Sequence, residues 1–451
     1  MMKRSPKDIR EAAKQLDFKI PLEEGNPCYV DTEKGRGGVF YNQLYKKMGF
    51  DISTFPNVSL PERGHTLFCG HVGCGKSTVL RRLKIELNKR GLFYVVFIDV
   101  LEVLDINNLQ YPDLLMALAN NLLQQLKDDE IEVDSGSMKK LQSWFKEKII
   151  TNEKVKSFAM EMKTVLNAVA GISSLTKIFG KIVNSFKIGT TDKEELRQVI
   201  VNHFSEFADA FHELIAAVES EVGKKNLGLK ILFIVDGTDK MSKDDSRRFF
   251  IEDSNQLKSV KANFLYGAPI HLFYSDVQVR QSFDHFMLPM IKIADRDEAK
   301  NRDGYEIMRK IVLLRADISL FDNPGTFEIP GTIDKIIEYS GGSPRELIRI
   351  LKNAYSYATD KFTEEAVMKG INSIAMDYER MLLPKGPRYY ELLHNIDNGR
   401  GVGEHSDIIE DLLFNLAMFE YNDNVGLFWR ANPVVRLLEN YRTALGSDKD
   451  K

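Results

Sequence analysis

A glycine-rich segment directly after an apolar run constrains this sequence more than any other feature. Residues 66–78 read Thr-Leu-Phe-Cys-Gly-His-Val-Gly-Cys-Gly-Lys-Ser-Thr, in which Gly70, Gly75, Lys76 and Ser77 fill the pattern G-x-x-x-x-G-K-[ST]. Glycines let backbone N–H groups turn inward around phosphates, and a helix that follows them adds the positive end of its dipole. The segment therefore predicts a loop that binds a nucleoside triphosphate, placed between a strand and a helix.

The polar side chains of this loop have expected roles. Lys76 can reach the β- and γ-phosphates, and the hydroxyl of Ser77 can ligate Mg²⁺. A chance glycine-rich turn before a helix is the plain alternative. It is the weaker interpretation, because a matching acidic strand follows later in the chain. The residues expected to hold the phosphates are Gly70, His71, Val72, Gly73, Cys74, Gly75, Lys76, Ser77 and Thr78.

A second apolar run ends in acidic residues. The apolar stretch within residues 230–235 is typical of a strand buried on both faces of a parallel sheet, and Asp236 follows it. A carboxylate at that end lies beside the phosphate loop, so Ser77 and Asp236 are the expected Mg²⁺ ligands. A helix-capping or turn aspartate is the alternative for Asp236. Asp239 can polarise the attacking water or be an ordinary turn aspartate, and both interpretations stay open.

Composition excludes several classes of protein. A chain of 451 residues is long enough for two or three domains. The net charge of −3 and the pI near 6.3 give no global attraction to nucleic acid, so a DNA contact would need a local patch. Cys28, Cys69 and Cys74 have no metal-binding spacing and suit a reducing cytoplasm. Without a signal peptide or an uncharged apolar run of about 18 residues, we expect a cytoplasmic chain with no membrane span.

Strands alternate with helices through much of the sequence. This pattern predicts an α/β fold, a P-loop NTPase with a doubly wound parallel sheet flanked by helices, and residues 93–100 and 262–274 supply further strands. Gly70 and Asp236 lie much further apart than the roughly 30 residues of a βαβ unit, so an insertion separates them. We expect a lead-in over 1–64 that wraps the nucleotide domain, a nucleotide-binding core over 65–126 and 230–300, a helical insertion over 127–229, a helical lid over 301–383 and a winged helix-like domain over 384–445.

The insertion contains a stretch with few charges, residues 157–187, whose apolar positions follow helical spacing. One interpretation is an amphipathic helix that contacts a partner or a membrane surface. The other is a helical hairpin, in which this stretch packs against a helix predicted over 192–222. We favour this packing.

Two further patterns follow the core. Residues 341–345, Gly-Gly-Ser-Pro-Arg, begin a helix with Ser343 as its cap and Pro344 at the first helical position. Near the C-terminus a short helix precedes a strand–turn–strand over 416–430 and a closing helix over 432–441. Helices followed by a hairpin outline a winged helix.

Taken in order, the phosphate loop, Asp236-Gly-Thr-Asp239, the 341–345 segment and the terminal hairpin resemble the AAA+/STAND P-loop ATPases, specifically bacterial single-chain members similar to replication-origin initiators. The resemblance covers residues from about 60 to 440 outside the insertion. It implies ATP or ADP as the bound nucleotide, with Mg²⁺. It also implies that Pro344 packs near the base and that Arg345 reaches the γ-phosphate, which its planar fork suits. The alternative for Arg345 is an ion pair with a surface carboxylate.

The sequence departs from this family in three places. Gly237 stands where AAA+ members often have Glu, which resembles the STAND variant and argues against fast hydrolysis. The strand that should end in a polar sensor residue ends in Tyr-Gly-Ala-Pro at 266–269. No arginine finger can be assigned: Arg247, Arg248 and Arg280 are candidates, and a plain surface arginine is the better interpretation for each.

The resemblance implies a switch ATPase, slow in isolation, whose nucleotide state controls self-assembly or contact with an effector protein in bacterial signalling or antiviral defence. The helical insertion is the expected contact surface. The alternative is a DNA-binding initiator or loader that uses the winged helix, but residues 405–416 carry Asp407, Glu410 and Asp411, the wrong sign for phosphates. A small-molecule kinase, the third class, would need neither the lid nor the winged helix.

Overall fold

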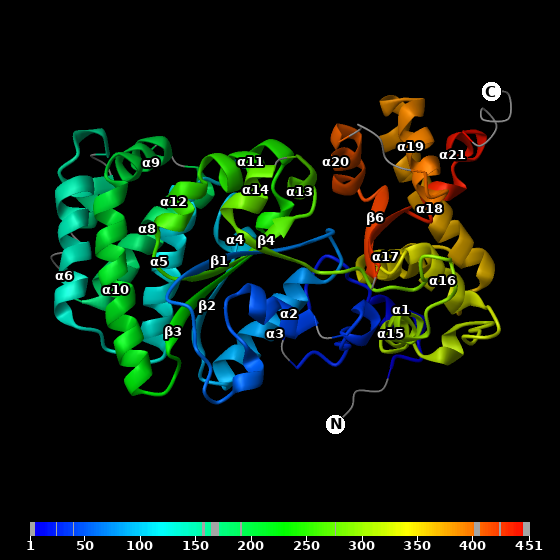
Figure 1. Cartoon of the computed structure of the whole chain (residues 1–451), viewed down its shortest axis with the longest axis horizontal. Coiled ribbons are helices and arrows are strands. Elements are labelled where there is room, and N and C mark those ends of the chain that lie inside the picture. The colour runs from blue at the N-terminus through cyan, green and yellow to red at the C-terminus, as the bar shows by residue number, and fades with distance from the viewer. Residues whose placement is uncertain are drawn as a thin grey trace.

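The computed structural model describes residues 5–23, 25–38, 40–155, 158–163, 171–189, 192–275, 277–400, 406–423 and 425–444. Within these residues, the centre of the molecule is a five-stranded parallel sheet in the order β2-β3-β4-β1-β5 (Figure 1). The predicted parallel α/β sheet is confirmed. Its strands are β1 (Gly64–Gly70), β2 (Phe93–Asp99), β3 (Lys230–Asp236), β4 (Asn263–Pro269) and β5 (Asp284–Met287).

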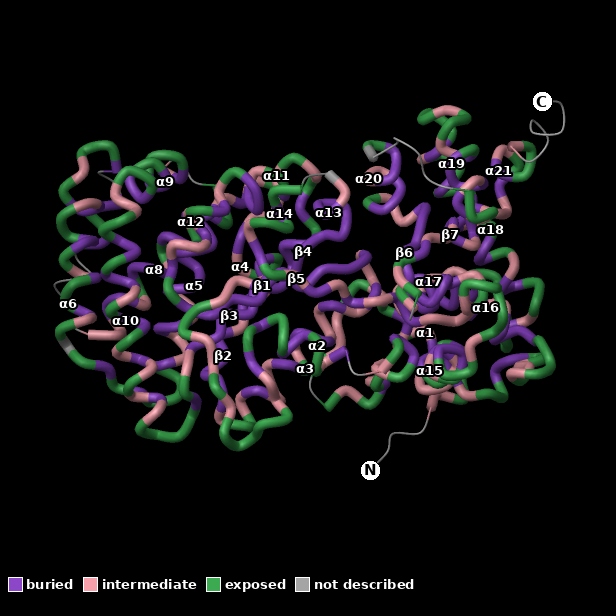
Figure 2. Tube along the Cα trace, viewed as in Figure 1, coloured by how far each residue is buried: buried purple, intermediate pink, exposed green. Residues whose placement is uncertain are grey.

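Helices cover both faces of the sheet, which explains why its central strands are apolar throughout. In β3, Phe233 belongs to a core shared with α5 (Tyr111–Asp128), whereas Ile234 belongs to a core shared with α3 (Lys76–Lys89). Alternate residues of one strand point to opposite faces, so they bury against different helical layers. The strands β1 to β4 are correspondingly buried along most of their length (Figure 2).

The connections that leave β1 and β4 run in opposite directions. From β1 the chain passes through α3 to β2 at one edge of the sheet. From β4 it passes through α13 (Leu272–Ser275) and α14 (Val277–Ser282) to β5, on the far side of β1. In open parallel sheets, ligands bind outside the carboxyl ends of the strands at such a point. The remaining short helices of this domain are α2 (Phe40–Lys47), α4 (Val100–Val103), α11 (Lys243–Arg247), a π-helical turn (Arg248–Glu252) and α12 (Ser254–Ser259).

The insertion between α5 and β3 is helical, as predicted. Its described part lies side by side with the sheet domain and shares one continuous core with it (Figure 1). No described helix combines the length and the apolar character that a membrane span requires. The helices are α6 (Ser135–Trp144), a π-helical turn (Phe145–Ile150), α8 (Ile172–Ile188), α9 (Lys193–Asn202) and α10 (Phe204–Lys224).

The stretch with few charges is buried by a different helix from the one expected. Positions 157 and 164–170 of this stretch lie outside the described residues, and α8 forms most of the rest. This helix packs chiefly on α5 and fully buries Phe179. Contact with the 192–222 region is minor: Phe179 meets Phe207 of α10 with ring centroids 6.4 Å apart. The single helix predicted there is split, because the backbone of His203 leaves the helical conformation (φ −118°, ψ 27°).

The lid is a helical domain as predicted, beginning at α15 (Arg302–Leu313). At the start of its third helix, Ser343 Oγ accepts the backbone N–H of Glu346 at 3.3 Å, and Pro344 is the first helical residue. The lead-in is only partly where we expected it, because Ile9 and Leu16, in and just after α1 (Ile9–Ala13), bury in the lid core rather than on the nucleotide domain. The other lid helices are α16 (Thr332–Ser340), α17 (Pro344–Tyr355) and α18 (Glu364–Leu382).

The C-terminal region contains the predicted strand–turn–strand as an antiparallel hairpin of β6 (Met418–Asp423) and β7 (Gly426–Ala431). The expected closing helix over 432–441 is wrong: a 3-10 turn, Val435–Leu437, and the short α21 (Glu439–Thr443) replace it, since Leu438 is extended. In Figure 1, β6 lies between the sheet domain and the lid helices. The hairpin is preceded by α19 (Pro387–Asp397) and α20 (Ser406–Phe414).

Candidate nucleotide-binding site

The phosphate loop has the geometry that its sequence predicts. It connects β1 to α3, and Gly73 and Gly75 have φ angles of +84° and +104°, which only glycine adopts at low cost. Among the described residues, no side chain caps the N-terminus of α3. The first N–H groups of this helix therefore keep their capacity to bind an anion, at the positive end of the helix dipole.

Lys76 is buried and forms an ion pair. Its Nζ donates to Asp239 Oδ2 at 2.8 Å and to the carbonyl oxygens of Gly70 and His71 at 2.8 and 2.9 Å. Burial alone would lower the pKa of Lys76, but the Asp239 carboxylate outweighs it and the pKa is raised. Burial likewise favours a raised pKa for Asp239, and Lys76 reverses this so that the pKa is lowered. Both groups are therefore charged in the folded protein.

Ser77 and Asp236, the expected Mg²⁺ ligands, lie next to each other. The hydroxyl of Ser77 donates to Asp236 Oδ1 at 3.0 Å, which joins the start of α3 to the end of β3. Burial, together with the nearby charges of Asp239 and Asp99, raises the pKa of Asp236 to about 6. Asp236 Oδ2 and Asp239 Oδ1 are buried and have no hydrogen-bond partner among the described residues. A hydroxyl beside carboxylate oxygens with spare capacity fits Mg²⁺, which prefers oxygen ligands and is usually held by one or two carboxylates together with phosphates.

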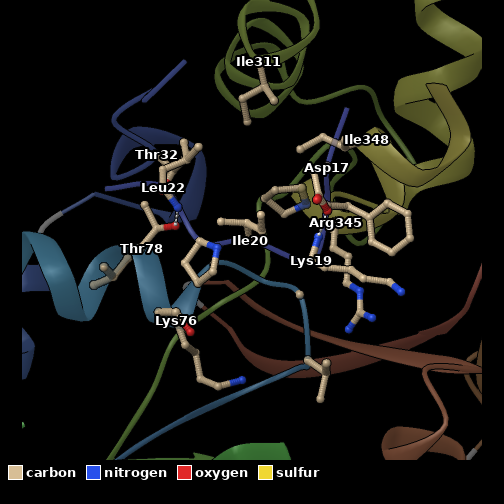
Figure 3. Close-up of a pocket in the computed structure, with 18 of the residues that line it drawn as sticks. Asp17, Lys19, Ile20, Leu22, Thr32, Lys76, Thr78, Ile311, Arg345 and Ile348 are labelled. Atoms are coloured by element: carbon tan, nitrogen blue, oxygen red, sulfur yellow. Dashed lines mark hydrogen bonds between the residues drawn. The ribbon is translucent and has the colours of Figure 1, made fainter. Parts of the chain in front are cut away.

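A cavity of about 590 Å³ opens in front of the loop (Figure 3). Its wall combines the N-terminal segment 17–36, the phosphate loop, the lid and residues 414–416. Lys76 and Arg345 lie on different sides of it, on α3 and α17. The charged side chains of the wall are mostly cationic, which suits a polyanionic ligand. They are the cations Lys19, Arg36, Lys76, Lys240, Arg315 and Arg345 and the acids Asp17 and Asp239.

The lid touches the phosphate loop directly at Arg345. The backbone N–H of Arg345 donates to the carbonyl of Gly73 at 3.3 Å, and a Cβ at Gly73 would lie 2.5 Å from the Cβ of Arg345. Pro344 also lines the cavity. Among the described residues Arg345 pairs with no carboxylate; its guanidinium lies 5.6 Å from the ring of Phe18. Within the part of the chain that the structure describes, the surface ion pair considered for Arg345 is not formed.

Arg36 is a residue of the site that sequence reasoning missed. Its side chain is buried and donates to the carbonyl of Cys74 in the phosphate loop (2.5 Å), to Thr32 Oγ1 (2.8 Å) and to the carbonyl of Pro289. Burial lowers the pKa of Arg36. The surrounding Lys-Gly-Arg-Gly-Gly looks like an ordinary polar turn in the sequence, so no local pattern distinguishes this arginine.

The C-terminal hairpin also contacts the loop, which the sequence did not predict. The backbone N–H of Glu420 in β6 donates to His71 Nε2 at 2.8 Å, and the ring of Phe419 meets His71 edge-on. Burial, with a smaller effect of Lys76, lowers the pKa of His71 to about 3, so this imidazole is neutral. The Tyr421 hydroxyl donates to the carbonyl of Gly341 at 2.7 Å. One strand thus contacts both the phosphate loop and the segment that starts α17.

The candidate arginine fingers lie away from the cavity. Arg248 pairs with Asp245 at 2.7 Å, and Arg280 is exposed on α14. Neither these residues nor Arg247 is among the described residues that line the cavity.

The parallel sheet, with the glycine-rich loop between β1 and α3, has the fold of a P-loop NTPase.

Comparison with family models finds no match, and comparison with curated proteins finds none either. Solved structures with a similar chain course include the Orc1 protein of Aeropyrum pernix in complex with DNA and Cdc6p of Pyrobaculum aerophilum. Each shares 11% identity with this chain at a TM-score of 0.32, over 86% of this chain and 87% and 88% of the other. A TM-score this low adds no argument about function, so the assignment depends on the site itself.

Proposed function

We propose that the chain is a Mg²⁺-dependent ATPase of the AAA+/STAND type whose nucleotide state acts as a switch. One observation carries this proposal: the cavity joins the phosphate loop, where Ser77 donates to Asp236 behind the cavity wall, and the lid arginine Arg345. The loop and the Ser77–Asp236 pair are the parts that phosphoryl transfer needs to hold a triphosphate and its metal. The arginine couples the bound phosphates to a separate domain.

The residues of the site would divide the work of ATP hydrolysis. The loop N–H groups and Lys76 bind the β- and γ-phosphates, and Ser77 and Asp236 hold Mg²⁺, which neutralises charge that develops on the phosphates. Arg345 binds the γ-phosphate from the lid. Asp239 is the carboxylate nearest to Lys76 in the cavity and would orient the attacking water. The apolar part of the wall, including Val30, holds the base.

Two contacts give the switch a structural basis. Arg345 meets the loop at Gly73, and β6 meets it at His71. A γ-phosphate that draws Arg345 or displaces the loop changes the stability of both contacts, and a ligand shifts a conformational equilibrium by its differential affinity for the two states. We infer that the lid and the hairpin move with the nucleotide and thereby control self-assembly or contact with an effector protein. A role in bacterial signalling or antiviral defence follows from the family resemblance alone.

A DNA-binding initiator or loader is the alternative function. The acidic helix α20 supports the first proposal over this one, because Asp411 pairs with Lys243 of the sheet domain at 2.8 Å and with Lys385. These intramolecular pairs give Asp411 a role within the chain. Duplex DNA added to the assays below would separate the two functions, since a loader needs DNA for assembly or for full activity.

The test combines phosphate release with solution mass. Wild type, Lys76→Ala and Asp236→Ala are assayed with ATP in Mg²⁺, and light scattering is recorded with ADP and with ATP plus Mg²⁺. We expect slow turnover in wild type, none in Lys76→Ala, and turnover impaired more than binding in Asp236→Ala. Growth into a defined oligomer only in wild type with ATP supports the switch. Equal hydrolysis by all three chains would contradict the site assignment.

A further inference from the structure

All the N–H donors of Lys76 are engaged inside the protein. They meet Asp239 Oδ2 and the carbonyl oxygens of Gly70 and His71, each within 2.9 Å. A lysine ammonium has three donors and no acceptor, so these contacts use its full capacity. Lys76 can therefore bind a phosphate oxygen only in exchange for one of its present acceptors.

Asp239 is the acceptor best placed to leave. The two carbonyl groups belong to the backbone at the end of β1 and in the loop, whereas Asp239 reaches Lys76 through a side chain on the short turn Thr238–Lys240. Asp239 also lines the cavity, and its Oδ1 is buried without a hydrogen-bond partner among the described residues. A phosphate that approaches Lys76 from the cavity therefore meets this carboxylate.

We propose that Asp239 and a phosphate group of the nucleotide exchange at Lys76, which makes Asp239 a competitor built into the site. The inference rests on the proposed function, because it concerns the same cavity. Opening a buried ion pair leaves a carboxylate without its cation, and like charges at one lysine repel. Asp239 consequently lowers the affinity of the chain for nucleotide.

The exchange also sets an order of events for hydrolysis. While Asp239 is bound to Lys76, the ammonium group lowers the pKa of this carboxylate and makes it a weak base for the attacking water. Once Lys76 turns to the phosphates, the carboxylate is released at the phosphate end of the cavity. The water oxygen then bonds to the γ-phosphorus, the bond to the bridging oxygen breaks with its electron pair leaving on ADP, and the water proton passes to Asp239 and on to solvent. One residue thus restrains binding and then assists turnover.

The test measures binding and turnover in Asp239→Asn, which keeps the shape of the side chain but removes its charge. Dissociation constants for ADP are measured in EDTA by titration calorimetry, and kcat is measured with ATP and Mg²⁺. We expect ADP to bind about tenfold more tightly, as loss of one charged competitor predicts. We expect kcat to fall by a factor on the order of 100 or more. Asp239→Ser repeats the test with a smaller side chain, and thermal denaturation verifies that each variant folds.

Asp99→Asn is the matched control. Asp99 is also a carboxylate close to Asp236, but it accepts from Arg81 at 3.1 Å and from the N–H of Leu101, and it makes no contact with Lys76. If the ADP dissociation constant of Asp99→Asn differs from wild type by less than threefold, the competition is specific to Asp239. If Asp99→Asn gains as much ADP affinity as Asp239→Asn, the effect is a general electrostatic one and the inference is overturned. Weaker ADP binding by folded Asp239→Asn would also overturn it. Wild type that binds no nucleotide would contradict the proposed function as well.

Discussion

The two walls of the nucleotide cavity are built in different ways. The phosphate wall is one continuous piece of chain, from β1 through the loop into α3. The opposite wall is assembled from three distant pieces, the segment 17–36, the lid helices and residues 414–416. The first wall depends on backbone conformation and a few charges, and the second depends on tertiary packing. The chemistry of the site is thus encoded locally, while its closure depends on how the domains meet.

This contrast predicts where substitutions act. Changes in the phosphate wall should weaken nucleotide binding more than they weaken the fold. Changes where the lid or the hairpin contacts the loop, at Gly73 and His71, should weaken both nucleotide binding and stability. Changes in the assembled wall should alter which nucleotide is preferred.

The largest effect is expected for Lys76→Ala in the phosphate wall. Loss of charge-assisted hydrogen bonds to two phosphates should weaken ATP binding about 100-fold or more. Equilibrium titration with a fluorescent ATP analogue measures this. Lys89→Ala, at the exposed C-terminal end of the same helix, is the control and should bind like wild type. Similar affinities for the two variants would place the nucleotide elsewhere.

Gly73→Ala tests the contact between the loop and the lid. An alanine there must adopt a left-handed backbone conformation and also overlaps the Cβ of Arg345. Gly37→Ala meets no described atom within 4 Å at a similar φ of +96°, so it carries the backbone strain without the collision. We expect Gly73→Ala to be about 2 kcal/mol less stable than Gly37→Ala in chemical denaturation and to bind ATP more weakly. Equal stability would mean that the lid does not rest on the loop.

The contact between the hairpin and the loop should make stability depend on pH through His71. Its pKa in the folded chain is about 3, whereas an unfolded histidine has a pKa near 6.5. Below pH 6.5 the unfolded state binds a proton that the folded state does not, so acidification favours unfolding. Between pH 7 and pH 5, protonation of this residue in the unfolded state should lower the free energy of unfolding by about 2 kcal/mol. In His71→Gln this part of the acid destabilisation should disappear, as measured by chemical denaturation at both pH values. If the variant loses as much stability as wild type, the imidazole is not enclosed by the hairpin.

The smallest effect is expected for Arg345→Ala in the assembled wall. Since this arginine is proposed to bind the γ-phosphate, ATP affinity should fall about tenfold while ADP affinity changes little. Lys352→Ala is the control, because Lys352 also lies over the ring of Phe18, at 5.3 Å, but does not line the cavity. Equal losses for ATP and ADP in Arg345→Ala would assign it to the shared part of the nucleotide.

The sequence predicts the phosphate wall well because each part of it is a local pattern. The glycines and Lys76 act within a few residues of where they stand. Outside this wall, the Ser343 cap of the lid is equally local, and Asp236 is placed by the parallel register of one sheet. The parallel fold follows from the same apolar runs.

Features decided by long-range packing could not be predicted. The spacing of apolar residues around Phe179 indicates a helix with one apolar face. It does not indicate that this face is buried by α5 rather than by the 192–222 region. Arg36 reaches Cys74 only because the lead-in folds back on the loop. Likewise, no pattern around His71 indicates a strand more than three hundred residues later as its partner.

Photolabelling with 8-azido-ATP tests most directly whether one nucleotide spans both walls. The azide sits on the base, so the label reports which residues lie at the end of the cavity away from Lys76. We predict labelled peptides from residues 17–36 or 311–348, with labelling suppressed by excess ATP and absent in Lys76→Ala. Labelling confined to other segments, or unchanged in Lys76→Ala, would contradict the composite site.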